Sequence, residues 1–425
     1  MYHQRFYFSG IASQMEAGRS TSSTVRAGSA LEVLRVFLKL GVTSFGGPVA
    51  HIGYFHREFV KRRGWLDDAA FTDLMGLCQF LPGPASSQLG FSIGLLRAGW
   101  RGALAAWCGF TLPSVALLLA FAAIAPALNG PVGSGLIHGL KLVAVAVVAQ
   151  AVWDMARRLC PDRRRAAIAL VAVALLNALA TVYAQLLVIV LGAVLGFALC
   201  ETSAAAATAT ARRHADAVRL SRTASAIALA LFCALLFGLP ALAAADPTGA
   251  VRVFDAFYRS GALVFGGGHV VLPLLQQATV AHGWVSSTDF LAGYGAAQAV
   301  PGPLFTFAAF LGWIMGPAPN HVWGAVLATA GIFLPGLLLV LAALPYWQSL
   351  RARPAAVAVL SGVNAAVVGV LASALYAPVW TSAVFSGIDF TIATVGFFLL
   401  TRWKVPPLVI VVLCAAAGIA EAMLR

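Results

Sequence analysis

Charged residues are scarce in this chain, and acidic residues are the scarcer kind. Only 10% of the 425 residues are charged, with 15 Asp and Glu against 28 Lys and Arg. Soluble globular proteins carry about 25% charged residues, so the composition excludes an ordinary soluble enzyme and a disordered chain. The hydrophobic class makes up 60% of the residues, and the mean hydropathy is +0.88. The sequence therefore predicts an all-α polytopic membrane protein.

Several motifs that would signal other chemistry are also missing. The 6 cysteines are scattered without CxxC spacing, so neither a disulfide framework nor a metal site is indicated. No GxxxxGKS loop or HExxH motif occurs, and we therefore expect no enzyme, no ATP hydrolysis and no cofactor. Residues 1–30 lack the apolar core of a signal peptide and are predicted to be a disordered cytoplasmic tail.

The formal net charge of +13 has two simple explanations, a nucleic-acid patch or the loop bias of an inner-membrane protein. The basic residues lie in clusters between apolar runs, such as 57–63, 157–165 and 212–222, and not along one helix face. Cytoplasmic loops of membrane proteins carry such an excess. We therefore expect an inner-membrane location with a cytoplasmic N-terminus and no nucleic-acid partner.

Nine apolar stretches approach the roughly 20 residues that a membrane-spanning helix needs. Two further regions, 36–100 and 254–316, are apolar but repeatedly broken by Gly and Pro. Between them, the polar segment 201–222 is predicted to be a cytoplasmic linker. The predicted spans are 102–128, 135–156, 166–182, 184–200, 223–245, 321–346, 355–379, 386–401 and 405–423.

The two broken regions share motifs at a nearly constant separation. GVTSFGG at 41–47 matches GALVFGG at 261–267, and QFLPGP at 79–84 matches QAVPGP at 298–303. WLDDAAF and WVSSTDF occur between these motifs in the two regions. The offset stays within 219–222 residues, which indicates an internal duplication.

The basic residues further predict that the second copy is inverted in the membrane. The basic turn at 57–63 is matched by 274–284, which has no Arg or Lys, and RRLCPDRRR at 157–165 is matched by TSAVFSGID at 381–389. Inverted repeats joined by one extra helix are a common transporter plan, with a site near the midplane. After the tail, the predicted segments are a first repeat at 31–200, the linker at 201–222, a connecting transmembrane helix at 223–245 and a second repeat at 250–425.

Each repeat contains an FGG break and a PGP break. Re-entrant hairpins of two half-helices fit 36–60 and 68–97 best, with closely paired full spans as the alternative. A half-helix that starts at membrane depth points unpaired N–H groups and partial positive charge into a cavity, which suits an anion. The alternative is that Gly and Pro only kink or pack the helices. The candidate substrate-binding residues at the breaks are Ser44, Gly46, Gly47, Pro82, Gly83, Pro84, Ser86, Ser87, Gly266, Gly267, Gly268, Pro301, Gly302, Pro303 and Thr306.

Five longer side chains near the breaks are further candidates for substrate binding. Gln79 and Gln298 each precede PGP by three residues and could donate to an oxyanion or join helices. Lys39 and Arg259 also correspond, and they either snorkel to the membrane surface or compensate an anion's charge. His269 has no counterpart and is either a packed side chain or a ligand.

Three ionisable residues are candidates for ion coupling. An acid inside a membrane is a functional candidate by default, and Asp73 has no acidic counterpart in the second repeat. A salt bridge from Asp73 to Arg57 or Arg97 is the alternative. Glu58 is expected to be solvated in its loop. Lys141 falls inside a predicted span, where it needs a partner or an anion.

Taken together, these strings resemble the chromate ion transporter family, from about residue 31 to the C-terminus. In the first half they are SFGGPVAHIGYFHREFVKRRGWLD (44–67), LCQFLPGPASSQLG (77–90) and GFTLP (109–113). In the second half they are VFGGGHVVLPLL (264–275), AAQAVPGPLFTFAAFLG (296–312) and LPGLLLVLAALPYW (334–347).

The resemblance implies a bidomain bacterial inner-membrane protein that exports chromate and confers chromate resistance. It also implies that the membrane potential or the proton gradient drives the export. The glycines and prolines that recur in the family correspond to the FGG, FGGG and PGP positions named above. A transporter of sulfate or another oxyanion, or an anion channel, remains the alternative. The expected partners are chromate, with sulfate as a competitor, the lipid bilayer and protons, and a homodimer stays open.

Overall fold

Every regular element that the computed structural model describes is a helix, which confirms the predicted all-α fold. The structure describes residues 28–128, 130–179, 184–200, 221–246 and 248–424. The predicted tail at 1–30 and linker at 201–222 lie almost wholly outside the described residues.

The helices repeat in the same order in the two halves of the chain. The first set is α2 (Ala30–Thr43), α3 (Gly47–Phe55), α4 (Asp68–Phe80), α5 (Ala85–Ile124), α6 (Gly130–Leu159), α7 (Arg163–Ala178) and α8 (Ala184–Leu199). The second set is α10 (Ala250–Ala262), α11 (Val271–Thr279), α12 (Ser287–Ala297), α13 (Phe307–Ile314), α14 (His321–Ala343), α16 (Pro354–Ala374), α17 (Gly387–Thr401) and α18 (Pro407–Leu424). Between the two sets in the chain comes α9 (Arg222–Ala245).

One helix of the first set, α5, has two counterparts in the second, because it contains a sharp bend. Ala98 and Gly99 have non-helical backbone angles, and the two parts of α5 pack against each other through Gly94 and Gly102. A Cβ on Gly94 would lie 2.4 Å from the carbonyl oxygen of Gly102. In the second repeat a Cβ on Gly312 of α13 would lie 2.3 Å from the carbonyl oxygen of Gly324 of α14. Each repeat therefore folds a short helix back onto a long one at a pair of glycines.

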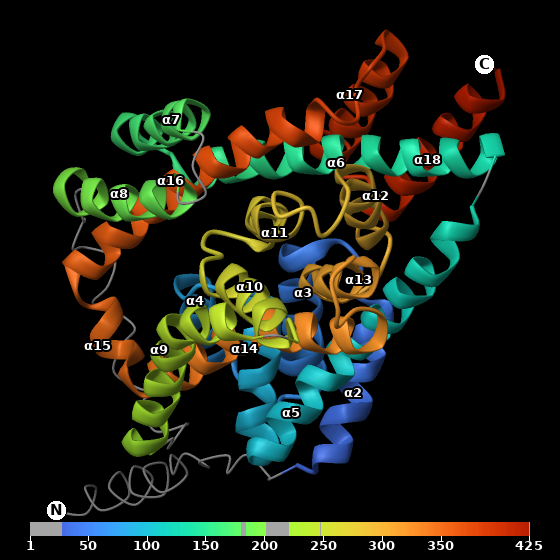
Figure 1. Cartoon of the computed structure of the whole chain (residues 1–425). Coiled ribbons are helices and arrows are strands. Elements are labelled where there is room, and N and C mark those ends of the chain that lie inside the picture. Colours follow the sequence, from blue (N-terminus) through green and yellow to red (C-terminus); the bar gives the residue numbers. More distant parts are fainter. Residues whose placement is uncertain (1–27, 129, 180–183, 201–220, 247, 425) are drawn as a thin grey trace, which may run out of the picture.

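The two repeats exchange their C-terminal helices. α6 packs against α17 and α18 of the second repeat, and α16 packs against α7 and α8 of the first. Figure 1 shows α7 and α8 beside α16 at one end of this layer, and α17 and α18 beside α6 at the other. Glycines allow the close approach, since a Cβ on Gly139 or Gly362 would lie 2.4 or 2.1 Å from a carbonyl oxygen of the facing helix. Neither repeat is a closed unit by itself.

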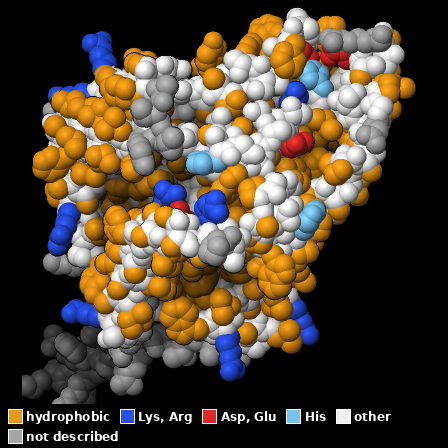
Figure 2. Space-filling view, viewed as in Figure 1, with side chains coloured by type: hydrophobic (Ala, Val, Ile, Leu, Met, Phe, Trp, Pro, Cys, Tyr) orange, Lys and Arg blue, Asp and Glu red, His pale blue; other side chains and the backbone are white. Residues whose placement is uncertain are grey.

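Within the part of the chain that the structure describes, six helices are long and apolar enough to cross a membrane: Ala85–Ala127, Gly130–Leu159, Arg222–Ala245, His321–Tyr346, Pro354–Trp380 and Pro407–Leu424. The other predicted spans, 166–182, 184–200 and 386–401, form helices of 16, 16 and 15 residues. Large hydrophobic side chains such as Phe197, Phe237 and Trp323 are exposed, and hydrophobic side chains cover much of the face in Figure 2. Such a surface suits lipid, and the chain is a multi-pass membrane protein.

Candidate functional site

The FGG and PGP strings are breaks between short helices, and hydrogen bonds join the breaks of opposite repeats. The N–H of Gly83 donates to the carbonyl of Val264, which precedes FGGG, at 2.8 Å. The N–H of Gly302 donates to the carbonyl of Ser44, which precedes FGG, at 2.9 Å. These crossed hydrogen bonds bring the four breaks to one place. They also engage the two PGP amides, which are therefore not open to an anion in this conformation.

Each PGP turn lies against the proline-containing long helix of the other repeat. Gly83 has a φ of +120°, and a Cβ there would lie 3.0 Å from the Cα of Gly336 on α14. Gly302 has a φ of +99°, and a Cβ there would lie 2.0 Å from the hydroxyl of Ser114 on α5. Both positions therefore require glycine for backbone conformation and for space. The Ser114 hydroxyl donates to the carbonyl of Pro301.

The helices that start at the breaks have no side-chain caps. α3 begins after Gly46, α5 after Pro84, the turn leading into α11 after Gly267, and the turn leading into α13 after Pro303. By contrast, α2, α4, α7, α9, α12 and α17 begin with a Ser or Asp that accepts a backbone N–H. The first amides of an uncapped helix keep their donors and the positive end of the helix dipole. Four such ends converging on one place can bind an anion.

Near these helix starts, some hydroxyl groups already donate a hydrogen bond and others have no partner. Thr306 donates to the carbonyl of Pro303 at 2.7 Å, so its proton is already used. The hydroxyls of Ser44 and Ser87 are buried, and they have no hydrogen-bond partner within the described part of the chain. An unpaired buried hydroxyl is costly, so these two serines are the best-placed side chains to donate to a ligand.

His51, which the sequence interpretation leaves out of the site, lies at its centre. On α3 it is fully buried, with Nδ1 3.4 Å from the Ser86 hydroxyl and Nε2 3.2 Å from the Ser44 carbonyl. A carbonyl only accepts, so Nε2 carries the proton and Nδ1 accepts from Ser86. The one sequence signal for His51 is its position one helical turn after Gly47.

Of the five longer side chains predicted near the breaks, only His269 lies in a turn that starts at a break. Lys39 and Gln79 are exposed, and Arg259 is about half exposed and pairs with Asp255 at 2.6 Å. Gln298 donates to the carbonyl of Tyr294 at 3.4 Å, while the Tyr294 hydroxyl lies 2.7 Å from Nδ1 of His269. For Lys39 and Arg259, this exposure favours snorkelling over compensation of an anion's charge.

Asp73 pairs with neither of its two expected arginines. Its Oδ1 lies 2.6 Å from Arg351 and 3.1 Å from Nε1 of Trp347, both in the second repeat. Arg97 instead contacts Glu32 at 3.2 Å. The predicted alternative of a bridge to Arg57 or Arg97 is therefore wrong in its partner, because folding brings a distant segment to Asp73.

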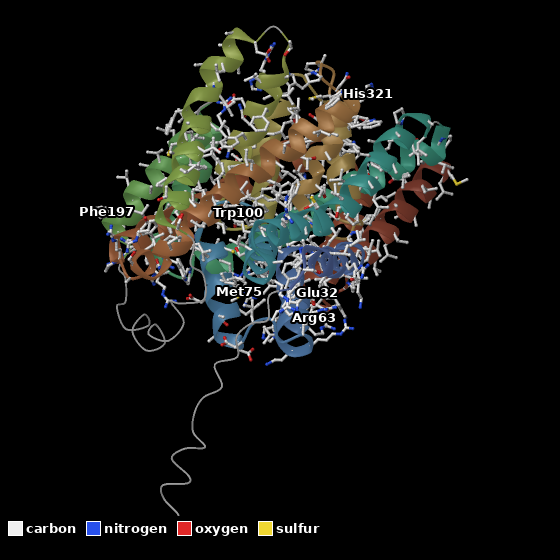
Figure 3. The ribbon with its side chains drawn as sticks, turned by 90° about the horizontal axis from the view of Figure 1, so that it is seen from below. Glu32, Arg63, Met75, Trp100, Phe197 and His321 are labelled. Carbon is white, nitrogen blue, oxygen red and sulfur yellow. The ribbon has the colours of Figure 1, made fainter. Side chains whose placement is uncertain are left out.

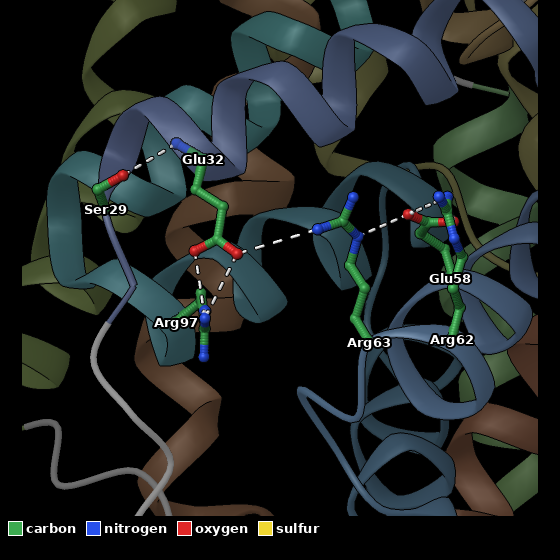
Figure 4. Close-up of polar contacts among 6 residues, drawn as sticks. All are labelled: Ser29, Glu32, Glu58, Arg62, Arg63 and Arg97. Carbon is green, nitrogen blue, oxygen red and sulfur yellow. Dashed lines mark hydrogen bonds and ion pairs between the residues drawn. The ribbon is translucent and has the colours of Figure 1, made fainter.

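Glu58 is not solvated, contrary to expectation. Its side chain is only 12% exposed, and it accepts from Arg63 at 2.6 Å and from Arg62 at 3.0 Å. Arg63 also reaches Glu32. Figure 4 shows this network at the start of α2, and Figure 3 shows Glu32 and Arg63 near each other in the whole molecule. In the turn after α3, Glu58 is therefore held in a structural ion pair.

Lys141, the third candidate for ion coupling, is buried and donates to the carbonyl of Ser382 at 2.8 Å. Both residues are distant in sequence from the FGG and PGP breaks.

Comparisons with known proteins identify the family. A family model described as chromate transporter matches residues 31–197 and again 251–419. A probable chromate transport protein of Synechococcus elongatus is 28% identical, covering 91% of this chain and 94% of its own length. Chromate transport proteins of Pseudomonas aeruginosa and Cupriavidus metallidurans are 29% and 27% identical, covering 90% and 81% of this chain and the same shares of their own. No solved structure matches the chain. With two matches that follow its two repeats, the chain belongs to the chromate transporter family.

Proposed function

We propose that this protein exports chromate across the bacterial inner membrane and thereby confers chromate resistance. The observation that carries the proposal is the convergence of four uncapped helix starts, held together by the crossed hydrogen bonds of Gly83 and Gly302. Chromate is a tetrahedral oxo-dianion, and its oxygens only accept hydrogen bonds. Free amides with the Ser44 and Ser87 hydroxyls supply donors without a basic pocket.

The membrane potential is sufficient to drive this export. Moving a charge out of a negative interior is favourable by about 2.3 kcal/mol per charge per 100 mV, and chromate carries two charges. A proton gradient would add to this drive.

Sulfate is the second candidate substrate, because the donors at the breaks are backbone amides and hydroxyls. Such donors recognise the shape and charge of a tetrahedral dianion and sense little of its central atom. We therefore expect sulfate to compete with chromate.

Everted membrane vesicles test the proposal directly. Vesicles containing the protein should accumulate labelled chromate when energised to a positive lumen, and excess sulfate should lower the rate. The matched control is Gly83→Leu, which cannot form the PGP turn. Uptake no greater than in the control would contradict export, and single-channel current steps in planar bilayers would identify an anion channel.

A further inference from the structure

Thr111 on α5 carries a third buried hydroxyl without a hydrogen-bond partner, beside those of Ser44 and Ser87. All three residues are buried, with Thr111 0% exposed. Their hydroxyl oxygens have no partner within the part of the chain that the structure describes. A buried polar group left in this condition is costly and needs an explanation.

Other buried threonines of this protein use an acceptor inside their own helix. Thr279 and Thr329 each donate to the carbonyl four residues earlier, at 2.7 Å. The corresponding carbonyl for Thr111 is that of Trp107, and the Thr111 hydroxyl makes no hydrogen bond to it. Its proton is therefore available to another acceptor.

The turn of α5 that contains Thr111 packs against the PGP break of the second repeat. A Cβ on Gly302 would lie 2.0 Å from the Ser114 hydroxyl and 3.1 Å from the Phe110 carbonyl, and Thr111 lies between these two residues in the helix. The N–H of Gly302 donates to the Ser44 carbonyl at 2.9 Å. Ser44 and Thr111 are therefore both placed at this PGP turn.

The bend in α5 brings Ser87 to the level of Thr111, because its two arms fold back on each other. His51 contacts both arms, with Nδ1 3.4 Å from the Ser86 hydroxyl and its ring centre 5.2 Å from that of Phe110. Ser87 and Thr111 each follow one of these contacts by one residue. Since Ser87 also follows the first PGP break, the three hydroxyls lie where the two PGP breaks meet.

The duplication provides an internal comparison for the three positions. At the offset of 219–222 residues, their counterparts in the second repeat are Val264, Thr306 and Phe333. Val264 and Phe333 are buried and apolar, and Thr306 already donates to the carbonyl of Pro303. The second repeat thus packs at these places without an unpaired hydroxyl. Packing alone does not explain the three hydroxyls of the first repeat.

Two other polar side chains of α5 without hydrogen-bond partners do not belong to this set. The Trp107 ring meets the Phe333 ring in a T-shaped contact with 5.7 Å between ring centres, and an aromatic face accepts an N–H group weakly. Gln88 donates its amide nitrogen to the carbonyls of Pro82 and Gly336 at 2.9 and 3.0 Å. The remaining Gln88 oxygen only accepts, so it offers nothing to an oxyanion.

Hydroxyl donors without acceptors match a ligand whose oxygens only accept. We propose that Thr111 binds the transported oxyanion together with Ser44 and Ser87, an assignment that rests on the proposed function. One tetrahedral oxyanion presents several oxygens and can accept from all three hydroxyls at once. The first repeat then holds the anion by side chains, while the second contributes its PGP turn.

The three hydroxyls are closed off from solvent in this conformation. The contacts between the PGP turns and the opposite repeat must therefore open before an anion can reach them. Movement of one repeat against the other around a fixed site is how transporters with inverted repeats work.

Binding of labelled chromate to the purified full-length protein tests the role of Thr111 without transport. Thr111→Val removes an unpaired hydroxyl, so the unfolding temperature should stay unchanged or rise. The affinity should weaken by roughly 5- to 30-fold, the effect of losing one hydrogen bond. Thr111→Ser keeps a hydroxyl and should retain most of the affinity.

Thr329→Val is the matched control, because Thr329 is a buried threonine of the long helix α14 whose hydroxyl is already used. Its affinity for chromate should equal that of the unaltered protein. Unchanged affinity in Thr111→Val would overturn the proposal. So would an equal loss in Thr329→Val, since the effect would then be structural.

Everted vesicles separate this proposal from the proposed function. In an active exporter, Thr111→Val should raise the chromate concentration for half-maximal uptake by the same factor as it weakens binding. If the purified protein binds chromate through Thr111 but vesicles accumulate none, export is wrong and the oxyanion site stands. If the unaltered protein binds neither chromate nor sulfate, the site itself is wrong.

Discussion

Individual residues of the turn after α3 stabilise it through paired charges. Burial alone would raise the pKa of Glu58, but hydrogen bonds from Arg63 and Arg62 outweigh it and hold that pKa below its ordinary value. A carboxyl whose pKa is lowered by folding contributes stability above its unfolded pKa, and that contribution is lost as the pH falls through the folded pKa. Glu58 therefore stabilises the protein at neutral pH and not in acid.

Glu58→Gln should lower the unfolding free energy by about 1–3 kcal/mol at pH 7, the usual cost of losing hydrogen bonds to a charged group. The deficit should begin to shrink once the pH falls below the ordinary pKa of a glutamate, and it should vanish as the pH falls through the lowered pKa of Glu58 in the folded protein. Thermal unfolding in detergent at several pH values measures both effects. The control is Asp68→Asn, because the pair of Asp68 with Lys61 is largely exposed and exposed pairs contribute little. Equal losses in the two variants would contradict the assignment.

A substitution of Ser87, whose hydroxyl has no hydrogen-bond partner within the described residues, can distinguish an effect on chromate binding from an effect on stability. Ser87→Ala removes a buried hydroxyl without a partner, so the unfolding temperature should stay unchanged or rise. Chromate uptake should nevertheless weaken, by roughly 5- to 30-fold in apparent affinity if one hydrogen bond of about 1–2 kcal/mol is lost. Ser92→Ala is the matched control, because the Ser92 hydroxyl donates to the carbonyl of Gln88 within its own helix. Uptake unaffected by Ser87→Ala would remove Ser87 from the binding site.

Among the elements, the PGP turns join the repeats at two related places. Gly83→Ala and Gly302→Ala should both abolish chromate uptake, because each adds a Cβ at positive φ and against the other repeat. Gly53→Ala is the control, since Gly53 lies within α3 with no atom near its missing Cβ, and alanine favours helix. Uptake and unfolding temperature should be measured for all three. A large loss in only one PGP variant would show that the two turns are not equivalent.

At the element scale, the sequence predicts local features well and distant partners poorly. The FGG and PGP strings locate the helix breaks because Gly and Pro act on their own backbone. The carbonyls of Val264 and Ser44 that accept across the repeats leave no such local signal. The same holds for Asp73, whose partner Arg351 lies 278 residues away.

For the whole molecule, the inverted repeats predict opposite sides for equivalent loops. In a cysteine-free background, a cysteine at Gly387 should react in intact cells with a maleimide that cannot cross the inner membrane, whereas a cysteine at Arg163, in the equivalent loop of the first repeat, should react only after the membrane is opened. Both positions are exposed, so accessibility within the protein does not decide the result. Labelling of both, or of neither, in intact cells would contradict the inversion.

The matched FGG and PGP strings at a constant offset identify the two repeats, yet they do not predict that the repeats exchange helices. Gly135 and Gly139 of α6 face α18, while Gly362 and Gly369 of α16 face α8 and α7. The choice between a partner in the same repeat and one in the other is made by the packing of the whole chain. For this reason the contact between His138 and Asp389, far apart in the sequence, is not an expected one.

The exchange of helices has a consequence for how the protein is made. The 16-residue helices α7 and α8 emerge from the ribosome long before their partner α16. During synthesis they must wait in or at the bilayer, with the apolar faces meant for α16 still uncovered. The first repeat is therefore complete only when the second is nearly finished, and a ribosome that stalls in between leaves a half-protein with no stable end state.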